Sequence, residues 1–211
     1  MNQYELTFSV NTQNKITVSL KDPLTLVGWN YAEPVLFRHD NKIITLANGP
    51  TYFNIRSMRD YLKKALNSKL HLHDSITSDI GYMFNQYNKN ECGFIIERFE
   101  NGFEGWTGYN YYLWEAYKNN KKYVTWIYND HNNNIIFKIT PSYPYRYCER
   151  MKKDHYIPFK KWILNYKPYF STQLSRETAQ QWLEQAEHVV KTVDDNIIRW
   201  EAEYKKSKLV L

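Results

Sequence analysis

The chain contains 211 residues, of which 43% are hydrophobic and 24% are charged. This balance supports a substantial apolar core and excludes an intrinsically disordered chain. The formal net charge is +6, which is basic but lacks the clustering that marks a nucleic-acid-binding domain. The seven glycines form neither a G-x-G-x-x-G nor a G-x-x-x-x-G-K-[ST] pattern, so these two kinds of phosphate-binding loop are excluded.

Neither the cysteines nor the N-terminus indicates export. Cys92 and Cys148 stand far apart, whereas secreted domains more often carry an even, dense set of disulfide-forming cysteines. The opening MNQYELTFSV lacks the basic and apolar regions of a signal peptide, and no apolar run is long enough to cross a membrane. We therefore expect a cytoplasmic protein that makes no membrane contact.

The first fifty residues alternate between apolar and polar positions. Residues 4–10 and 16–20 do so on either side of an Asn-rich segment at 11–14, which is typical of a β-hairpin. Asn48-Gly49-Pro50 closes this part of the chain. Further apolar runs lie at 24–29, 35–37 and 43–46. The pattern predicts an antiparallel meander.

A helix is predicted near residues 54–67, where apolar residues recur at three- and four-residue spacing. Its polar face carries Arg59, Lys63 and Lys64. Shorter helices are predicted at 80–87 and 156–164, and a buried strand at 92–99.

The clearest hairpin occupies the middle of the chain. Its arms are 123–128 and 135–139, joined by the segment 130–134, which reads Asp-His-Asn-Asn-Asn. Asn and Asp tolerate the left-handed backbone conformation that tight hairpin turns require. Pro141 and Pro144 are expected to end the second arm, because proline cannot donate a hydrogen bond to the strand ladder.

A long helix is predicted from Ser175 onward. Ser175 is expected to cap its N-terminus, and Glu177 lies in the first turn, where the helix dipole favours an acid. We expect the helix to lie across the sheet, with pairing to another chain as the alternative. Its apolar stripe comprises Ala179, Trp182, Ala186, Val189, Val193, Ile197 and Trp200.

Together these elements predict an α+β fold, in which an antiparallel, meander-like sheet packs against a few helices including the long C-terminal helix. No repeat, Pro/Gly-rich linker or low-complexity tract divides the chain. Residues 1–211 are therefore expected to form a single domain.

No residue pattern marks a catalytic, cofactor-binding or metal-binding site. His71 and His73 alternate before Asp74, which would place both histidines on one face of a strand, but no further ligands are marked by spacing. No serine lies in a G-x-S-x-G elbow. We therefore expect no metal, no cofactor and no enzymatic activity, with an unrecognised site around His71, His73 and Asp74 as an alternative.

Acids are concentrated between residues 91 and 116, where five of them accompany one base. Within this stretch, residues 97–106 alternate acids with aromatics, and Gly102 and Gly105 would permit backbone shapes that expose the aromatics. A solvated face is one interpretation. The other is a recognition surface for a basic protein, on which aromatics anchor and carboxylates steer the partner. The candidate partner-binding residues are Glu97, Glu100, Phe103, Glu104 and Trp106.

Bases are concentrated between residues 117 and 170, where eleven of them face three acids. A solvated face, an acidic partner or nucleic acid would each account for this. No RNA- or DNA-reading motif is present, and several of the interleaved aromatics are needed for the core. We therefore expect nucleic-acid binding to be at most weak and non-specific. These aromatics are Tyr143, Tyr145, Tyr147, Phe159, Trp162 and Tyr166.

The hairpin segments 125–130 (TWIYND) and 135–144 (IIFKITPSYP) resemble a hairpin found in bacterial immunity proteins of contact-dependent growth inhibition and related polymorphic toxin systems. In those proteins a similar "TPxYP" turn precedes a basic stretch and a C-terminal helix. The similarity covers about residues 107–200. It implies a non-enzymatic protein that binds a cognate toxin domain and blocks its active site or substrate access. The rival interpretation is a nucleic-acid-associated protein that uses segment 117–170.

Overall fold

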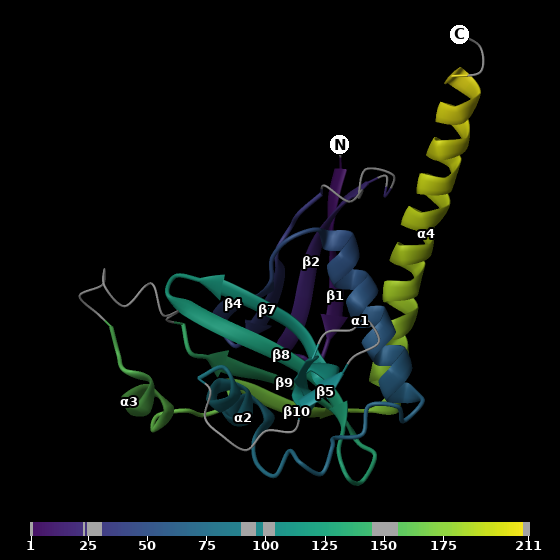
Figure 1. Cartoon of the computed structure of the whole chain (residues 1–211). Coiled ribbons are helices and arrows are strands. Elements are labelled where there is room, and N and C mark those ends of the chain that lie inside the picture. The colour runs from purple at the N-terminus through teal and green to yellow at the C-terminus, as the bar shows by residue number, and fades with distance from the viewer. Residues whose placement is uncertain are drawn as a thin grey trace. The chain divides into compact units, whose positions relative to one another are not determined.

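The computed structural model describes residues 2–22, 24, 31–89, 96–98, 104–144 and 156–208. The chain divides into two compact units, of which unit 1 contains residues 1–66 and 175–211 and unit 2 contains residues 67–174. The α+β class is confirmed, with the strands in two four-stranded antiparallel sheets and one two-stranded sheet (Figure 1). A single domain over residues 1–211 stays a prediction.

The sheet of unit 1 is the antiparallel meander that the sequence predicts. Its order is β1-β2-β3-β4, with each strand paired to the next in the chain. The Asn11 carboxamide oxygen accepts hydrogen bonds from the backbone N–H groups of Gln13 and Asn14, at 3.0 and 2.9 Å, which shapes the first turn. Of the predicted run at 24–29, all but residue 24 lies outside the described residues. The strands are β1 (Asn2–Ser9), β2 (Asn14–Asp22), β3 (Val35–His39) and β4 (Lys42–Ala47).

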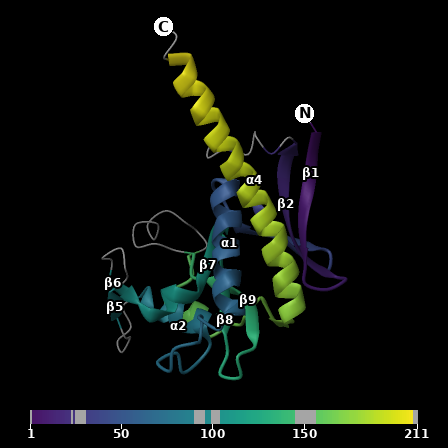
Figure 2. The same cartoon turned by 90° about the vertical axis from the view of Figure 1, so that its right-hand side faces the viewer.

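Two helices complete unit 1. They are α1 (Thr51–Leu66) and α4 (Arg176–Lys208), which lie side by side in Figures 1 and 2. The predicted cap is confirmed, because the Ser175 hydroxyl oxygen accepts a hydrogen bond from the Thr178 backbone N–H at 3.0 Å. α4 also contacts the sheet, since the Trp182 indole N–H donates to the Ser9 carbonyl at 2.9 Å and the Trp182 ring meets Phe8 edge-on at 5.9 Å.

The predicted apolar stripe of α4 is buried only in its first five members. Ala179, Trp182, Ala186, Val189 and Val193 are 2% exposed or less. Ile197 is half-buried. Trp200 is 63% exposed, so the stripe extends beyond the core that it builds.

Unit 2 contains the predicted central hairpin, with β8 (Lys121–Asn129) paired to β9 (Ile135–Ser142). The Asp130 carboxylate accepts hydrogen bonds from the backbone N–H groups of Asn132 and Asn134 at 3.0 and 2.8 Å, and Asn133 has the expected positive φ of 63°. The sheet order is β10-β9-β8-β7. The outer strands are β7 (Tyr112–Lys118) and β10 (Phe170–Leu174).

The expectation that Pro141 ends the second arm is wrong. Pro141 lies inside β9, with Tyr123 of β8 as its neighbour in register. On the other edge, β10 pairs with β9 only from Ile135 to Ile139. Beyond Ile139 this edge of β9 has no ladder to complete, and a strand edge without ladder bonds tolerates proline.

The remaining elements of unit 2 are short. The predicted helix at 80–87 is confirmed as α2 (Ile80–Tyr87), and the one near 156–164 is shorter than expected, as α3 (Phe159–Ile163). β5 (Ile96–Arg98) pairs with β6 (Glu104–Trp106), and a 3-10 turn, η2 (Thr107–Tyr111), leads into β7. The rest of the strand predicted at 92–99 lies outside the described residues. Within the part of the chain that is described, no helix is long and apolar enough to cross a membrane.

Replacing Val189 by Asp should unfold unit 1. Val189 is 2% exposed, and an unpaired carboxylate in an apolar site costs about 3–5 kcal/mol, a large share of the stability of a typical domain. Circular dichroism and thermal unfolding of Val189→Asp measure the loss. The control is Lys191→Asp on the exposed face of the same helix. A folded Val189→Asp protein with a changed oligomeric state would show that this stripe packs on another chain.

Candidate functional site

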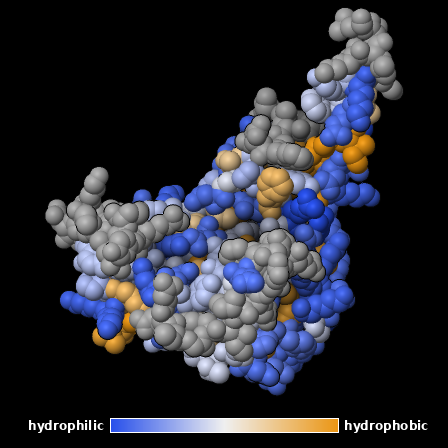
Figure 3. All heavy atoms as spheres, viewed as in Figure 1, coloured by the Kyte–Doolittle hydropathy of each residue, from blue (hydrophilic) through white to orange (hydrophobic). Residues whose placement is uncertain are grey.

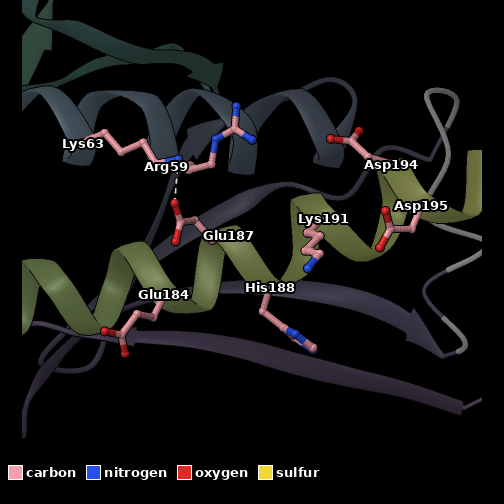
Figure 4. Close-up of a pocket in the computed structure, with 8 residues that line it drawn as sticks. All are labelled: Arg59, Lys63, Glu184, Glu187, His188, Lys191, Asp194 and Asp195. Atoms are coloured by element: carbon pink, nitrogen blue, oxygen red, sulfur yellow. Dashed lines mark ion pairs between the residues drawn. The ribbon is translucent and has the colours of Figure 1, made fainter.

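An open groove runs between α1 and α4 on the surface of unit 1 (Figure 4). It has a volume of about 590 Å³. Two of its side chains come from α1 and six from α4, and all eight are polar or charged. They are Arg59, Lys63, Glu184, Glu187, His188, Lys191, Asp194 and Asp195.

Helical periodicity places these side chains together. On α1, Met58 and Leu62 are buried, which leaves Arg59 and Lys63 one turn apart on the outer face. On α4, polar residues recur every three or four positions between 184 and 195, on the side opposite the buried stripe. The contact of the two helices along their apolar faces therefore creates a groove with charged walls.

Both signs of charge line the groove. Lys63 of α1 forms an ion pair with Glu187 of α4 at 2.6 Å, drawn as a dashed line in Figure 4. Arg59 pairs with its neighbour Asp60 at 2.7 Å. Because these pairs are partly exposed, each contributes about 0–1 kcal/mol, and a charged partner can compete for them.

At one end of the groove, the Tyr52 hydroxyl donates a hydrogen bond to the Asp194 carboxylate at 2.5 Å. Burial and then this carboxylate raise the pKa of Tyr52, which keeps the hydroxyl protonated as a donor. Farther along, Glu184, Lys191 and Asp195 are exposed. Among the described residues, Lys191 and Asp195 have no ion-pair partner, so they are available to one. The arrangement suits a polar surface that itself presents both signs of charge.

The structure divides the acidic segment that the sequence singled out. Glu104, in β6, is exposed. Glu97 lies in β5 at the register position of Gly105, and its side chain lies outside the described part. Glu100 and Phe103 are also outside the described residues. The role of this segment in partner binding stays a prediction.

The expected exposure of Trp106 is wrong. Trp106 is fully buried, and its ring meets those of Phe84, Tyr87 and Trp126 at 6.3, 5.9 and 6.5 Å. A Cβ at Gly108 would collide with the Trp106 ring, so the chain follows the indole closely here. Trp106 is a core residue of unit 2, because tertiary packing overrides the acidic character of its neighbours in sequence.

The segment from His71 to Asp74 forms a turn. The Tyr111 hydroxyl donates to the His71 carbonyl at 2.5 Å and accepts from the His73 backbone N–H at 2.9 Å. The His73 ring nitrogen Nδ1 lies 2.8 Å from the Ser75 hydroxyl. Nowhere in the described part do three His, Cys, Asp or Glu side chains gather as metal ligands would.

The described bases of segment 117–170 differ in exposure. Lys122 pairs with Glu115 at 2.5 Å and Lys138 with Asp79 at 2.8 Å. Five others are exposed, namely Lys118, Lys121, Lys160, Lys161 and Lys167.

The aromatics of this segment mostly pack on one another. The Tyr143 ring meets Phe159 at 5.3 Å and Trp162 at 5.5 Å, and Trp162 meets Tyr166 at 6.2 Å. These contacts hold α3 against the end of β9, so the described rings serve packing instead of offering a stacking platform for bases. Tyr145 and Tyr147 lie outside the described residues.

A polar cluster that the sequence did not reveal joins three segments of unit 2. Asp79 caps α2, accepting hydrogen bonds from the backbone N–H groups of Gly81 and Tyr82 at 3.0 and 3.1 Å. The same carboxylate accepts from Lys138 of β9 at 2.8 Å and from the Tyr166 hydroxyl. A Cβ at residue 81 would collide with Thr140 and Tyr166, so only glycine permits this close approach.

Opposing effects set the pKa values in this cluster. Burial raises the pKa of Asp79, but the hydrogen bonds from Lys138 and Tyr166 and the charge of Lys138 outweigh it and hold that pKa below its ordinary value. Burial lowers the pKa of Lys138, and the bond to Asp79 more than compensates, so that pKa is raised. Burial and the Asp79 charge raise the pKa of Tyr166. Asp79 and Lys138 are therefore a charged pair at neutral pH, and Tyr166 is a neutral donor.

The groove residues of α4 escaped the sequence analysis. The three- and four-residue recurrence of charge from Glu184 to Asp195 was a readable signal, but it is shared by every solvated helix face. Only the pairing of α4 with α1 makes a groove of it.

Comparison with known proteins adds no relative. No family model, curated protein or solved structure matches the chain.

The Asp79 cluster should give unit 2 an acid-sensitive component of stability. A carboxyl whose pKa is lower in the folded state stabilises above its ordinary pKa of 3.8, and this contribution is lost as the pH falls through the folded-state pKa. Thermal unfolding of the full chain between pH 7 and pH 2 should show this fall, and Asp79→Asn should be less stable at neutral pH with a weaker acid dependence. Asp74→Asn, at an exposed aspartate of the same unit, should behave as wild type. An unchanged pH profile in Asp79→Asn contradicts the assignment.

Proposed function

We propose that this chain is a non-enzymatic, cytoplasmic immunity protein that binds a cognate bacterial toxin domain and neutralises it. The observation that carries the proposal is the open, two-signed charged groove between α1 and α4. Charged walls of both signs favour a protein partner, because complementary charges steer association and fix the register of a protein–protein contact.

The central hairpin supports the same proposal. Segments 125–130 and 135–144, which carry the resemblance to immunity proteins, form β8, β9 and the residues that follow. The Tyr143 hydroxyl of the "TPxYP" turn donates to the Ile157 carbonyl at 2.7 Å, and its backbone N–H donates to the Asn85 carboxamide at 2.6 Å. The turn thus serves folding, and the partner-binding surface is expected elsewhere.

A charge swap in the groove separates binding from stability. Lys191 and Asp195 are exposed and one turn apart, so Lys191→Asp with Asp195→Lys keeps the net charge and an intrahelical pair but reverses the pattern that a partner meets. The toxin domain encoded beside the gene is expressed in cells together with each variant, and survival is measured. Wild type should protect, and the swap should lose protection with an unchanged melting temperature.

The matched control is Lys121→Asp, at an exposed lysine of unit 2, which should protect like wild type. Full protection by a folded swap variant would show that the groove is not the toxin-facing surface. Failure of the wild-type chain to protect against that toxin domain would overturn the proposed function.

The acidic segment is the rival surface for the same partner. Glu100→Lys with Glu104→Lys should leave the melting temperature nearly unchanged, since Glu104 is exposed, and should reduce protection if the toxin contacts this segment. Loss of protection here, with retention in the groove swap, would assign the interface to residues 97–106.

A further inference from the structure

The last turns of α4 carry apolar side chains that the core does not use. Ile198 and Trp200 are 64% and 63% exposed, and Tyr204 is 48% exposed. The Trp200 and Tyr204 rings stack at 5.5 Å with an interplanar angle of 12°. Figure 3 shows hydrophobic surface toward this end of α4, and Figures 1 and 2 show the helix continuing past α1. Exposed Trp and Tyr on a regular helix are typical of a protein interface.

The exposed rings continue the buried face of the same helix. Trp200 follows Val193 by about two helical turns, and Tyr204 follows Trp200 by about one. Val193 is 2% exposed and Ile197 is half-buried, so one face of α4 passes from core to surface near Ile197. A second helix laid on the exposed turns would extend the packing that α1 provides along the earlier ones.

Charges on the two sides of this face indicate what the second helix is. At 3.6 residues per turn, Asp194 and Lys205 lie on one side of the Trp200 face and about three turns apart. Their midpoint falls beside Trp200. An identical helix running antiparallel and centred there brings Asp194 of each copy opposite Lys205 of the other.

The opposite side of the face repeats the pattern. Arg199 and Glu203 lie there one turn apart, both exposed, with their midpoint one residue beyond Trp200. The same antiparallel placement therefore sets Arg199 opposite Glu203 on this side. A parallel copy would set each charge against its own kind, which is unfavourable.

From this self-complementarity we propose that the C-terminal turns of α4, from Ile197 to Lys205, pair antiparallel with the same turns of a second copy of this chain. The two Trp200 side chains meet at the centre of the contact. Because the surface spans only about two to three turns, the dimer is weak, with a dissociation constant in the micromolar range or above. The proposal does not depend on the proposed function, since the groove and this face are different surfaces of α4.

Sedimentation equilibrium of the full chain, from micromolar to millimolar concentration, tests the pairing. Wild type should show a monomer–dimer equilibrium, and Trp200→Ala should weaken it by at least about tenfold with an unchanged melting temperature. Leu164→Ala removes an even more exposed apolar side chain, 83% exposed in unit 2, and should leave the equilibrium unchanged. A chain that is monomeric at every concentration, or a dimer that survives Trp200→Ala, overturns the proposal.

Disulfide trapping tests the direction. In a chain with Cys92→Ser and Cys148→Ser, oxidation should cross-link Glu201→Cys, because position 201 lies next to the two-fold axis. It should not cross-link Lys205→Cys, because the two copies of position 205 are about 15 Å apart along the helix axes. Cross-linking of both variants indicates parallel pairing, and cross-linking of neither indicates that these turns do not meet; each result overturns the proposal.

Discussion

Close packing of α4 against α1 is the contact on which unit 1 depends. The buried face of α4 is built largely from small side chains, Ala179, Ala186, Val189 and Val193, so the helix axes can approach closely. Longer polar side chains at the margins of the two helices are then brought within reach of each other, as the Lys63–Glu187 pair shows. The charged groove is thus a by-product of apolar packing, and its shape follows from the size of residues that never reach the surface.

α4 serves three purposes along its length. Its first turns close the core of unit 1, its outer face between Glu184 and Asp195 walls the groove, and its last turns leave the core with an apolar face still exposed. Unit 2 has no comparable helix. There the Asp79 carboxylate joins α2, β9 and the segment after α3 by hydrogen bonds, where apolar contact alone would leave buried donors unpaired.

Sequence reasoning succeeded where structure is decided by neighbouring residues. The hairpin at 121–142, helix 80–87 and the Ser175 cap each follow from turn chemistry or periodicity within a short window. It failed where distant residues decide. The burial of Trp106 depends on Phe84 and Trp126, which lie far from it in sequence. The division of the strands into two sheets and the meeting of α1 with α4 are likewise long-range pairings that no local pattern specifies.

The candidate site was less predictable than the fold. The residues chosen for it were conspicuous in sequence because acids and aromatics alternated there, yet the aromatic at 106 belongs to the core. The groove side chains were inconspicuous because charge at helical spacing is the ordinary dress of a solvated face. Their significance arises only when a second helix, contributed from the other end of the chain, is placed beside them.

Unit 1 is built from both ends of the chain, and this has a consequence for biosynthesis. The four strands and α1 leave the ribosome first, but α4, which covers them, follows only after the roughly one hundred residues of unit 2. During that interval the apolar faces of Ile55, Met58 and Leu62 lack their partner helix, whereas every segment of unit 2 is already present when α4 begins to emerge. Unit 2 can thus fold first, although it lies in the middle of the chain, and the N-terminal segment waits for the C-terminal one.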